Sequence, residues 1–415
     1  MSAGNFLTAI FLARALVPSE YGMFALLYAV MLFMVSVHSA LIAYGLSIQG
    51  AAGTDFELQR LSGRSLVLTV AMGVVLGAAT AGVAIAFHRA SLAPWILLAL
   101  LFWQLQETTR RALMSRLRHR DAVRGDVLSY LGQAACVGYL FQGNRLTLTS
   151  AFGAMAATSA AAFLLQVVQL KLAPLHFPGA LRLLPQFWQL GRWALLANVA
   201  QAFMGQALLW LLALASTAYV ASFQSILNLL RVTNPLMFAI GGVLLPAVAA
   251  QRGKSTAGLH AARRYFQLGA LALLPYFGLV FVAPGAMLRL LYGAGSAYTG
   301  LGLELRALAL GFGFLYLGHI LGSYYYGLAR SDIVLRCQLV AAVSTVATGA
   351  ILVARWGILG AVIAFDLGSL LQAAAFVWFL YGGAAADAQP PLRPRPVRAL
   401  YAPEVKADEM DPGNL

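Results

Sequence analysis

Four polar side chains within one apolar stretch could bind an anion inside a membrane. Gln224, Asn228, Arg231 and Asn234 recur at helical spacing within residues 217–249, so they share one face of the expected helix. A charged side chain at mid-bilayer costs about 2.5–3.5 kcal/mol and therefore usually faces protein or water. The stripe predicts either a cavity in which Arg231 grips an anionic substrate, or an internal hydrogen-bonded network that holds the helices together.

A second polar pair lies in the preceding apolar stretch. Asn198 and Gln201 share a face of residues 188–214, and Arg192 lies near one end of that stretch. The pair could face the same cleft or form hydrogen bonds between helices. Arg192 could bind substrate, or it could extend to the lipid headgroups.

Two acidic residues are candidates for ion coupling. Glu107 precedes Arg110 and Arg111 by three and four residues, which is also the ordinary spacing of a salt bridge on a helix. Asp366 lies in the last apolar stretch with no obvious local partner, so it could bind a proton or a cation, or pair with an arginine of another helix. For the lone histidines His38 and His319, packing is the better interpretation.

Motifs that would support catalysis are missing from the sequence. It contains no P-loop, and its two cysteines have no spacing typical of a disulfide framework or a metal site. We therefore expect no metal, no cofactor and no enzymatic activity, although an integral membrane polymerase or ligase of polysaccharides remains an alternative.

The composition explains what kind of protein positions these residues. Of the 415 residues, 61% are hydrophobic and only 10% are charged, whereas soluble domains carry about 25% charged residues. A lipid environment accepts such a surface, and the net charge of +14 resides in short gaps between apolar runs. The pattern predicts an all-α membrane protein and no nucleic-acid partner.

Apolar stretches long enough to cross a bilayer recur about twelve times. A spanning helix needs about 20 residues, and Pro235 predicts a kink in one of the stretches. The first stretch is short for a span, so we expect a truncated first helix. The predicted segments are 1–16, 21–49, 64–87, 92–109, 126–142, 146–170, 188–214, 217–249, 264–290, 301–328, 333–354 and 357–381.

The distribution of basic residues predicts the orientation. With a cytoplasmic N-terminus, 21 of the 28 Lys and Arg residues fall in the inside gaps and the tail, and 6 fall at the outside ends. Because basic residues favour the cytoplasmic side, we expect both termini in the cytoplasm.

Two halves are expected. SEYGMFALLYAV (19–30) corresponds to TAYVASFQSILN (217–228), which suggests a duplication into two six-helix bundles around a central cleft. The predicted parts are an N-terminal bundle at 1–170, a cytoplasmic linker at 171–187, a C-terminal bundle at 188–381, and a disordered cytoplasmic tail at 382–415.

The stretch ARALVPSEYGMFALLYAV (13–30) resembles the "ARLLGPEEYG-x-F" stretch of polysaccharide and O-antigen flippases. These belong to the multidrug/oligosaccharidyl-lipid/polysaccharide (MOP) exporter superfamily. Residues 218–249 and 357–381 are also similar to the second half of that family. The sequence departs from the pattern at Val17, where the family has glycine before the proline.

The resemblance implies a flippase. Its substrate would be an undecaprenyl-pyrophosphate-linked oligosaccharide, moved by alternating access from the inner to the outer leaflet of the cell inner membrane. Membrane lipids, and a polymerase and glycosyltransferases of the same pathway, are the implied partners. A multidrug/cation antiporter or a lipid II flippase of the same superfamily is the alternative.

Overall fold

The chain folds into helices throughout its described part. The computed structural model describes residues 3–52, 55–172, 177–249, 255–328 and 330–382. Within these ranges the secondary structure is α-helix with short 3₁₀ and π pieces, and no strand. The elements are α1 (Ala3–Ala15), α2 (Pro18–His38), η1 (Ser39–Ala43), α3 (Tyr44–Ala52), α4 (Asp55–Ala86), η2 (Ala90–Leu92), α5 (Ala93–Ser115), α6 (His119–Asp126), η3 (Val127–Leu131), α7 (Gly132–Gln142), α8 (Leu148–Leu170), α9 (Phe177–Leu181), α10 (Leu184–Ala215), α11 (Thr217–Arg231), α12 (Asn234–Ala249), α13 (Ser255–Val282), α14 (Pro284–Tyr292), α15 (Gly302–Gly327) and α16 (Ser331–Gly382).

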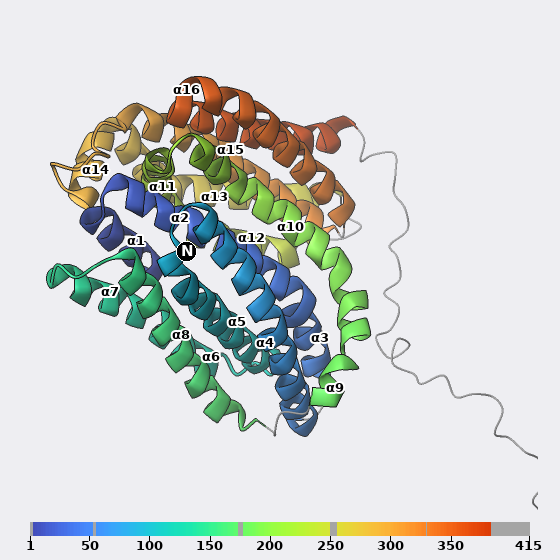
Figure 1. Cartoon of the computed structure of the whole chain (residues 1–415). Helices are drawn as coiled ribbons and strands as arrows, with labels where there is room; N and C mark the ends of the chain where they lie inside the picture. Colours follow the sequence, from blue (N-terminus) through green and yellow to red (C-terminus); the bar gives the residue numbers. More distant parts are fainter. Residues whose placement is uncertain (1–2, 53–54, 173–176, 250–254, 329, 383–415) are drawn as a thin grey trace, which may run out of the picture. The chain divides into compact units, whose positions relative to one another are not determined.

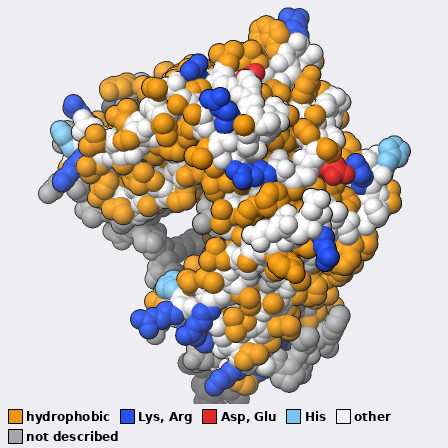
Figure 2. Space-filling model, turned by 90° about the vertical axis from the view of Figure 1, so that its left-hand side faces the viewer, with side chains coloured by type: hydrophobic (Ala, Val, Ile, Leu, Met, Phe, Trp, Pro, Cys, Tyr) orange, Lys and Arg blue, Asp and Glu red, His pale blue; other side chains and the backbone are white. Residues whose placement is uncertain are grey.

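Several of these helices are long and apolar enough to cross a membrane. Six qualify within the described residues, and a seventh span results if α11 and the first part of α12 are counted together. Hydrophobic side chains dominate the face shown in Figure 2, where basic side chains outnumber acidic ones. The protein is a multi-pass membrane protein; twelve spans and cytoplasmic termini stay predictions.

The predicted segment 217–249 is not one continuous helix. It breaks between Arg231 and Asn234, and the two parts meet at a bend of 48°. Pro235 explains the position of the break, because proline cannot donate a helical hydrogen bond to the carbonyl four residues earlier, that of Arg231, and its ring clashes with that carbonyl. The predicted kink is confirmed, but Arg231 ends α11 instead of lying in mid-helix.

A second break divides α16. Gly357 has φ 56° and ψ −122°, a conformation that interrupts the helix between two long runs. Glycine adopts this left-handed φ without a steric cost, which an L side chain would incur. The break agrees with the predicted boundary between 333–354 and 357–381.

The chain divides into two compact units, residues 1–376 and 377–415. Within the first unit, α5 packs between α4 and α8, while α12 packs against both α13 and α15. The predicted linker 171–187 includes α9, and α10 begins at Leu184, ahead of the expected 188. Most of the predicted tail, 383–415, lies outside the described residues, and the two-bundle division stays a prediction.

Helices α2 and α11 hold residues from far apart in the sequence against each other. They carry the two stretches expected to be related by duplication, and their contact is among the most extensive in the first unit. Asn228 donates a hydrogen bond to the Tyr21 hydroxyl at 2.9 Å. A Cβ placed on Gly22 would lie 1.6 Å from the Thr217 carbonyl oxygen, so the two backbones meet where a side chain has no room.

We predict that Gly22→Ala lowers stability, because the added methyl group forces the α2 and α11 backbones apart. Overpacking costs about 1–3 kcal/mol or more, so the thermal unfolding midpoint of the detergent-purified protein should fall by several degrees. Gly82→Ala on α4 is the matched control, since its Cβ meets nothing within 4 Å. Equal midpoints for Gly22→Ala and wild type would contradict this account of the contact.

Candidate functional site

A cavity of about 530 Å³ lies among α10, α11, α12, α15 and α16. This volume falls in the range of small-molecule binding pockets. The described lining residues all fall within positions 205–376, which lie inside the predicted C-terminal bundle, 188–381. The lining residues are Gly205, Leu208, Phe223, Leu227, Arg231, Asn234, Met237, Phe238, Gly241, Gly242, Leu245, Phe312, Leu315, Gly318, His319, Gly322, Ser323, Tyr326, Val334, Gln338, Ala341, Thr345, Phe365, Gly368, Ser369, Gln372 and Phe376.

Arg231 and Asn234 line this cavity from the two sides of the α11–α12 bend. Among the described lining residues, Arg231 is the one permanently charged side chain, and none is Asp or Glu. Arg231 also lies within electrostatic range of the phenols of Tyr21 and Tyr28 on α2. A partly buried guanidinium without a lining carboxylate can accept an anion from outside the protein.

The other half of the predicted stripe has a different environment. Gln224 donates to Asn228 at 2.8 Å, and Asn228, which is fully buried, donates to Tyr21. Gln224 also borders a small cavity of about 20 Å³ that has space for one water molecule. Asn228 thus joins α11 to α2, whereas Arg231 at the end of α11 and Asn234 beyond the bend line the larger cavity.

Of the remaining binding candidates, Arg192 has a described side chain. It is exposed on α10 and is not among the described lining residues of the 530 Å³ cavity. The side chains of Asn198 and Gln201 lie outside the described residues.

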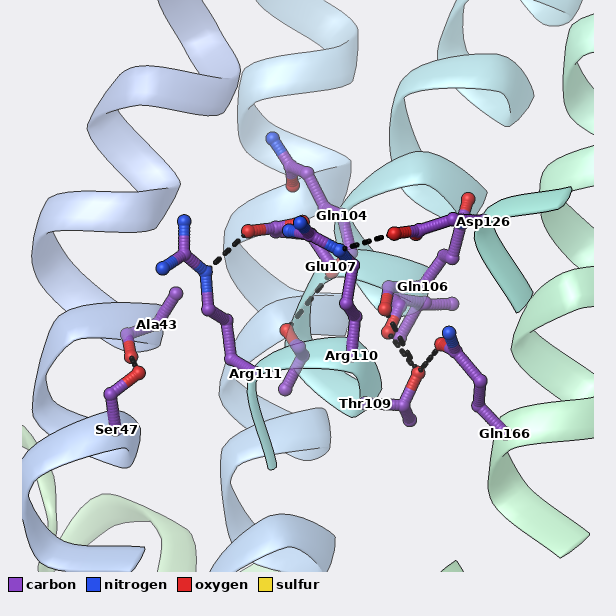
Figure 3. Close-up of polar contacts among 12 residues, drawn as sticks. Ala43, Ser47, Gln104, Gln106, Glu107, Thr109, Arg110, Arg111, Asp126 and Gln166 are labelled. Carbon is purple, nitrogen blue, oxygen red and sulfur yellow. Dashed lines mark hydrogen bonds and ion pairs between the residues drawn. The ribbon is translucent and has the colours of Figure 1, made fainter. Parts of the chain in front are cut away.

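Glu107 lies at the centre of a charged network on α5. It accepts from Arg110 Nη1 at 2.9 Å and from Arg111 Nε at 2.5 Å, and Arg110 Nε also donates to Asp126 at 3.0 Å (Figure 3). Both oxygens of Glu107 therefore contact guanidinium groups. The side chain of Glu107 is 10% exposed, so a largely buried carboxylate and partly exposed arginines tie α5 to the end of α6.

Next to this network, α5 carries uncharged polar residues inside the protein. Thr109 donates to Gln166 of α8 at 2.6 Å (Figure 3). His38 of α2 is fully buried and lies 3.2 Å from the hydroxyls of both Thr69 and Thr108. These contacts connect α2, α4, α5 and α8, in agreement with the packing interpretation of His38.

Asp366, the other ion-coupling candidate, lies on the second run of α16 and is not a lining residue of the cavity. Its Oδ1 faces the backbone of α15, where a Cβ on Gly311 would come within 2.0 Å of it. The structure therefore brings Asp366 and Glu107 into two different polar environments, and ion coupling by either stays a prediction.

Sequence reasoning missed most of the uncharged polar lining. On α16, Gln338, Thr345, Ser369 and Gln372 all reach the cavity, as does His319 of α15, for which packing was expected. A helical-spacing signal exists for the second run of α16, where positions 365, 369, 372 and 376 fall on one face. This face does not by itself predict a cavity, because serine and glutamine in membrane helices also form hydrogen bonds between helices.

We predict that Glu107→Gln destabilises the protein by about 1–3 kcal/mol, because Arg110 and Arg111 would then lack a largely buried carboxylate. The thermal unfolding midpoint in detergent should fall by several degrees. Glu20→Gln provides the control, since the Glu20–Arg89 pair is 3.9 Å long and well exposed and should contribute little. A midpoint for Glu107→Gln as high as that of the control would contradict the structural role.

Comparison with known proteins gives matches among solved structures. An inward-facing multidrug resistance MATE family transporter of the MOP superfamily matches with a TM-score of 0.77 and 15% identity, covering 91% of this chain and 94% of that one. The lipid II flippase MurJ in an inward closed conformation gives 0.75 and 13%, covering 91% and 85%. A MOP superfamily transporter from Pyrococcus furiosus, described as having a binding pocket of reverse polarity, gives 0.63 and 13%, covering 90% of each chain.

Comparisons by sequence add no assignment. No protein-family model matches the chain. No curated protein matches it either. At 13–15% identity the structural likeness shows the fold alone, and over nine-tenths of its length this chain has the fold shared by transporters and flippases of the MOP superfamily.

Proposed function

We propose that the protein translocates an undecaprenyl-pyrophosphate-linked oligosaccharide from the inner to the outer leaflet of the cell inner membrane. The observation that carries the proposal is Arg231, a cation on the wall of a 530 Å³ cavity whose described lining contains no carboxylate. The fold shared with MOP transporters and the resemblance of residues 13–30 to polysaccharide flippases support the same conclusion.

The chemistry of the substrate fits this arrangement. A sugar and a diphosphate cannot cross hydrocarbon unaided, because their polar groups would lose their hydrogen bonds to water. A guanidinium donates paired hydrogen bonds to phosphate oxygens and keeps its charge at every physiological pH. Arg231 would hold the diphosphate while the lipid tail stays in the bilayer.

Contacts at one end of the first unit support alternating access. Arg14, at the end of α1, donates to the backbone carbonyls of Leu291 at 2.6 Å and Leu290 at 2.7 Å, at the end of α14. These two bonds join the predicted halves, as does the hydrogen bond from Asn228 of α11 to Tyr21 of α2. The chain also matches an inward-facing MATE transporter better than an outward-facing one, with TM-scores of 0.77 and 0.62.

The alternatives differ in the charge of the ligand. A cation antiporter would be expected to offer acidic groups to its drug, and the described lining of the cavity offers none. A lipid II flippase would move a related lipid-linked substrate, and the TM-score of 0.75 to the lipid II flippase MurJ keeps that function as the second candidate. The polymerase or ligase alternative has less support, because the solved structures matched above are named as transporters and a flippase.

We predict that Arg231→Gln inserts and folds but loses transport, while Arg231→Lys keeps part of it, because lysine supplies the charge without the paired donors. Transport is measured as the outward movement of lipid-linked oligosaccharide in a strain lacking the gene. Lipid II as a parallel substrate separates the second candidate from the first. Full activity of a well-expressed Arg231→Gln protein would eliminate the substrate role of Arg231.

We also predict that Arg14→Ala loosens the contact between α1 and α14, because the two bonds to the Leu290 and Leu291 carbonyls are lost. Spin labels at Val17 and Leu290, both exposed, should show a distance distribution shifted to longer values. Arg145→Ala, which removes another exposed arginine, should leave the distribution unchanged. An unchanged distribution in Arg14→Ala would mean that these bonds do not hold the halves together.

A further inference from the structure

Three uncharged polar side chains of the cavity, Thr345, Ser369 and Gln372, are placed where a ligand could bond to them. Thr345, Ser369 and Gln372 are each less than 9% exposed. They line the cavity, and none of the three side chains forms a hydrogen bond to another described residue. Because buried polar groups are normally paired, their placement indicates a ligand or water that offers several hydrogen-bonding groups.

Two further groups strengthen this indication. His319 Nε2 is buried and has no hydrogen-bond partner among the described residues. It faces α12, where a Cβ on Gly241 would lie 2.5 Å from it and 2.7 Å from Ser323 Oγ. Because Gly241 has no side chain, the imidazole and the hydroxyl pack directly against α12. Ser323 Oγ donates to the His319 carbonyl at 2.9 Å and can still accept a hydrogen bond.

Aromatic rings form another part of the wall, beside aliphatic side chains and glycines. Phe238 meets the His319 ring edge-on with centroids 5.3 Å apart, and Phe376 stacks on Tyr325 at 5.7 Å. Phe238 is 59% exposed and Tyr326 is 45% exposed, although both line the cavity. An apolar ring beside amide and hydroxyl groups suits a ligand with both apolar C–H faces and hydroxyl edges.

We propose that this cavity binds the sugar next to the diphosphate of the substrate. The proposal rests on the function proposed above, in which Arg231 holds the diphosphate at the α11–α12 bend. Gln372, Ser369 and Thr345 then bond to sugar hydroxyls, and the aromatic rings cover the sugar's C–H faces. The described lining contains no acid, so the site suits a neutral or anionic sugar and disfavours a cationic one.

A prenyl tail fits the same walls less well. A hydrocarbon chain in the cavity would displace water from Gln372, Ser369 and Thr345 and would offer them no hydrogen bond, which is costly for each group. The bilayer, in contrast, accepts the tail at no such cost. The sugar is therefore the part of the substrate for which the cavity provides complementary groups.

The test compares binding of lipids with and without a sugar by the full-length protein in lipid nanodiscs. The probes are undecaprenyl diphosphate, and the same lipid carrying one glucose, galactose, N-acetylglucosamine or N-acetylgalactosamine. Dissociation constants come from the change in intrinsic tryptophan fluorescence. We expect at least one sugar-bearing probe to bind about five- to tenfold more tightly than the sugar-free lipid, which corresponds to one additional net hydrogen bond or slightly more.

Variants identify where the sugar binds. Gln372→Leu should reduce the gain from the sugar to less than twofold and leave sugar-free binding within twofold of wild type. Ser369→Ala, which removes one hydroxyl and adds no volume, should reduce the gain in the same direction. Gln142→Leu, at an exposed position of α7, is the matched control and should keep the full gain. Arg231→Gln should weaken every probe by a similar factor.

Two results would overturn the proposal without affecting the proposed function. The first is Arg231-dependent binding of all five probes with equal affinity. The second is tighter binding of the sugar-free lipid by Gln372→Leu, which would assign the cavity to the prenyl tail. Failure of every probe to bind the wild-type protein would instead reject the proposed function itself.

Discussion

The close approach of α2 and α11 is the contact on which the rest of the arrangement depends. The missing side chain of Gly22 lets the Thr217 carbonyl approach the α2 backbone, and Asn228 then reaches Tyr21. This contact fixes the part of α11 that precedes the bend. The chain then bends by 48° just ahead of Pro235, and Arg231 and Asn234 line the cavity from the two sides of this bend.

Much of the fold could be predicted from the sequence, because hydrophobic length and proline have direct physical consequences. The helical content and the break near Pro235 follow from them, as does the interruption at Gly357. Helical spacing also placed Gln224, Asn228, Arg231 and Asn234 on one stripe. It could not show that α11 ends at Arg231 and that Asn234 lies beyond a bend, on a helix with different neighbours.

The lining of the cavity was harder to predict for a different reason. Ser369 and Gln372 become informative only when their lack of protein partners is seen, and a partner can lie anywhere in the fold. The opposite holds for Glu107, where the local spacing of Arg110 and Arg111 already indicated the observed ion pairs. Local partners can be recognised in a sequence, whereas the absence of a distant partner cannot.

The contact between Arg14 and the end of α14 requires a particular side chain on α1 but none on α14. Its acceptors are the main-chain carbonyls of Leu290 and Leu291, which every amino acid possesses. Substitutions at positions 290 and 291 would therefore preserve both bonds, as long as α14 keeps its length and its final turn. The bonds depend on one side chain and on the end of one helix, so on the α14 side an insertion or deletion would be far more disruptive than any exchange of residue.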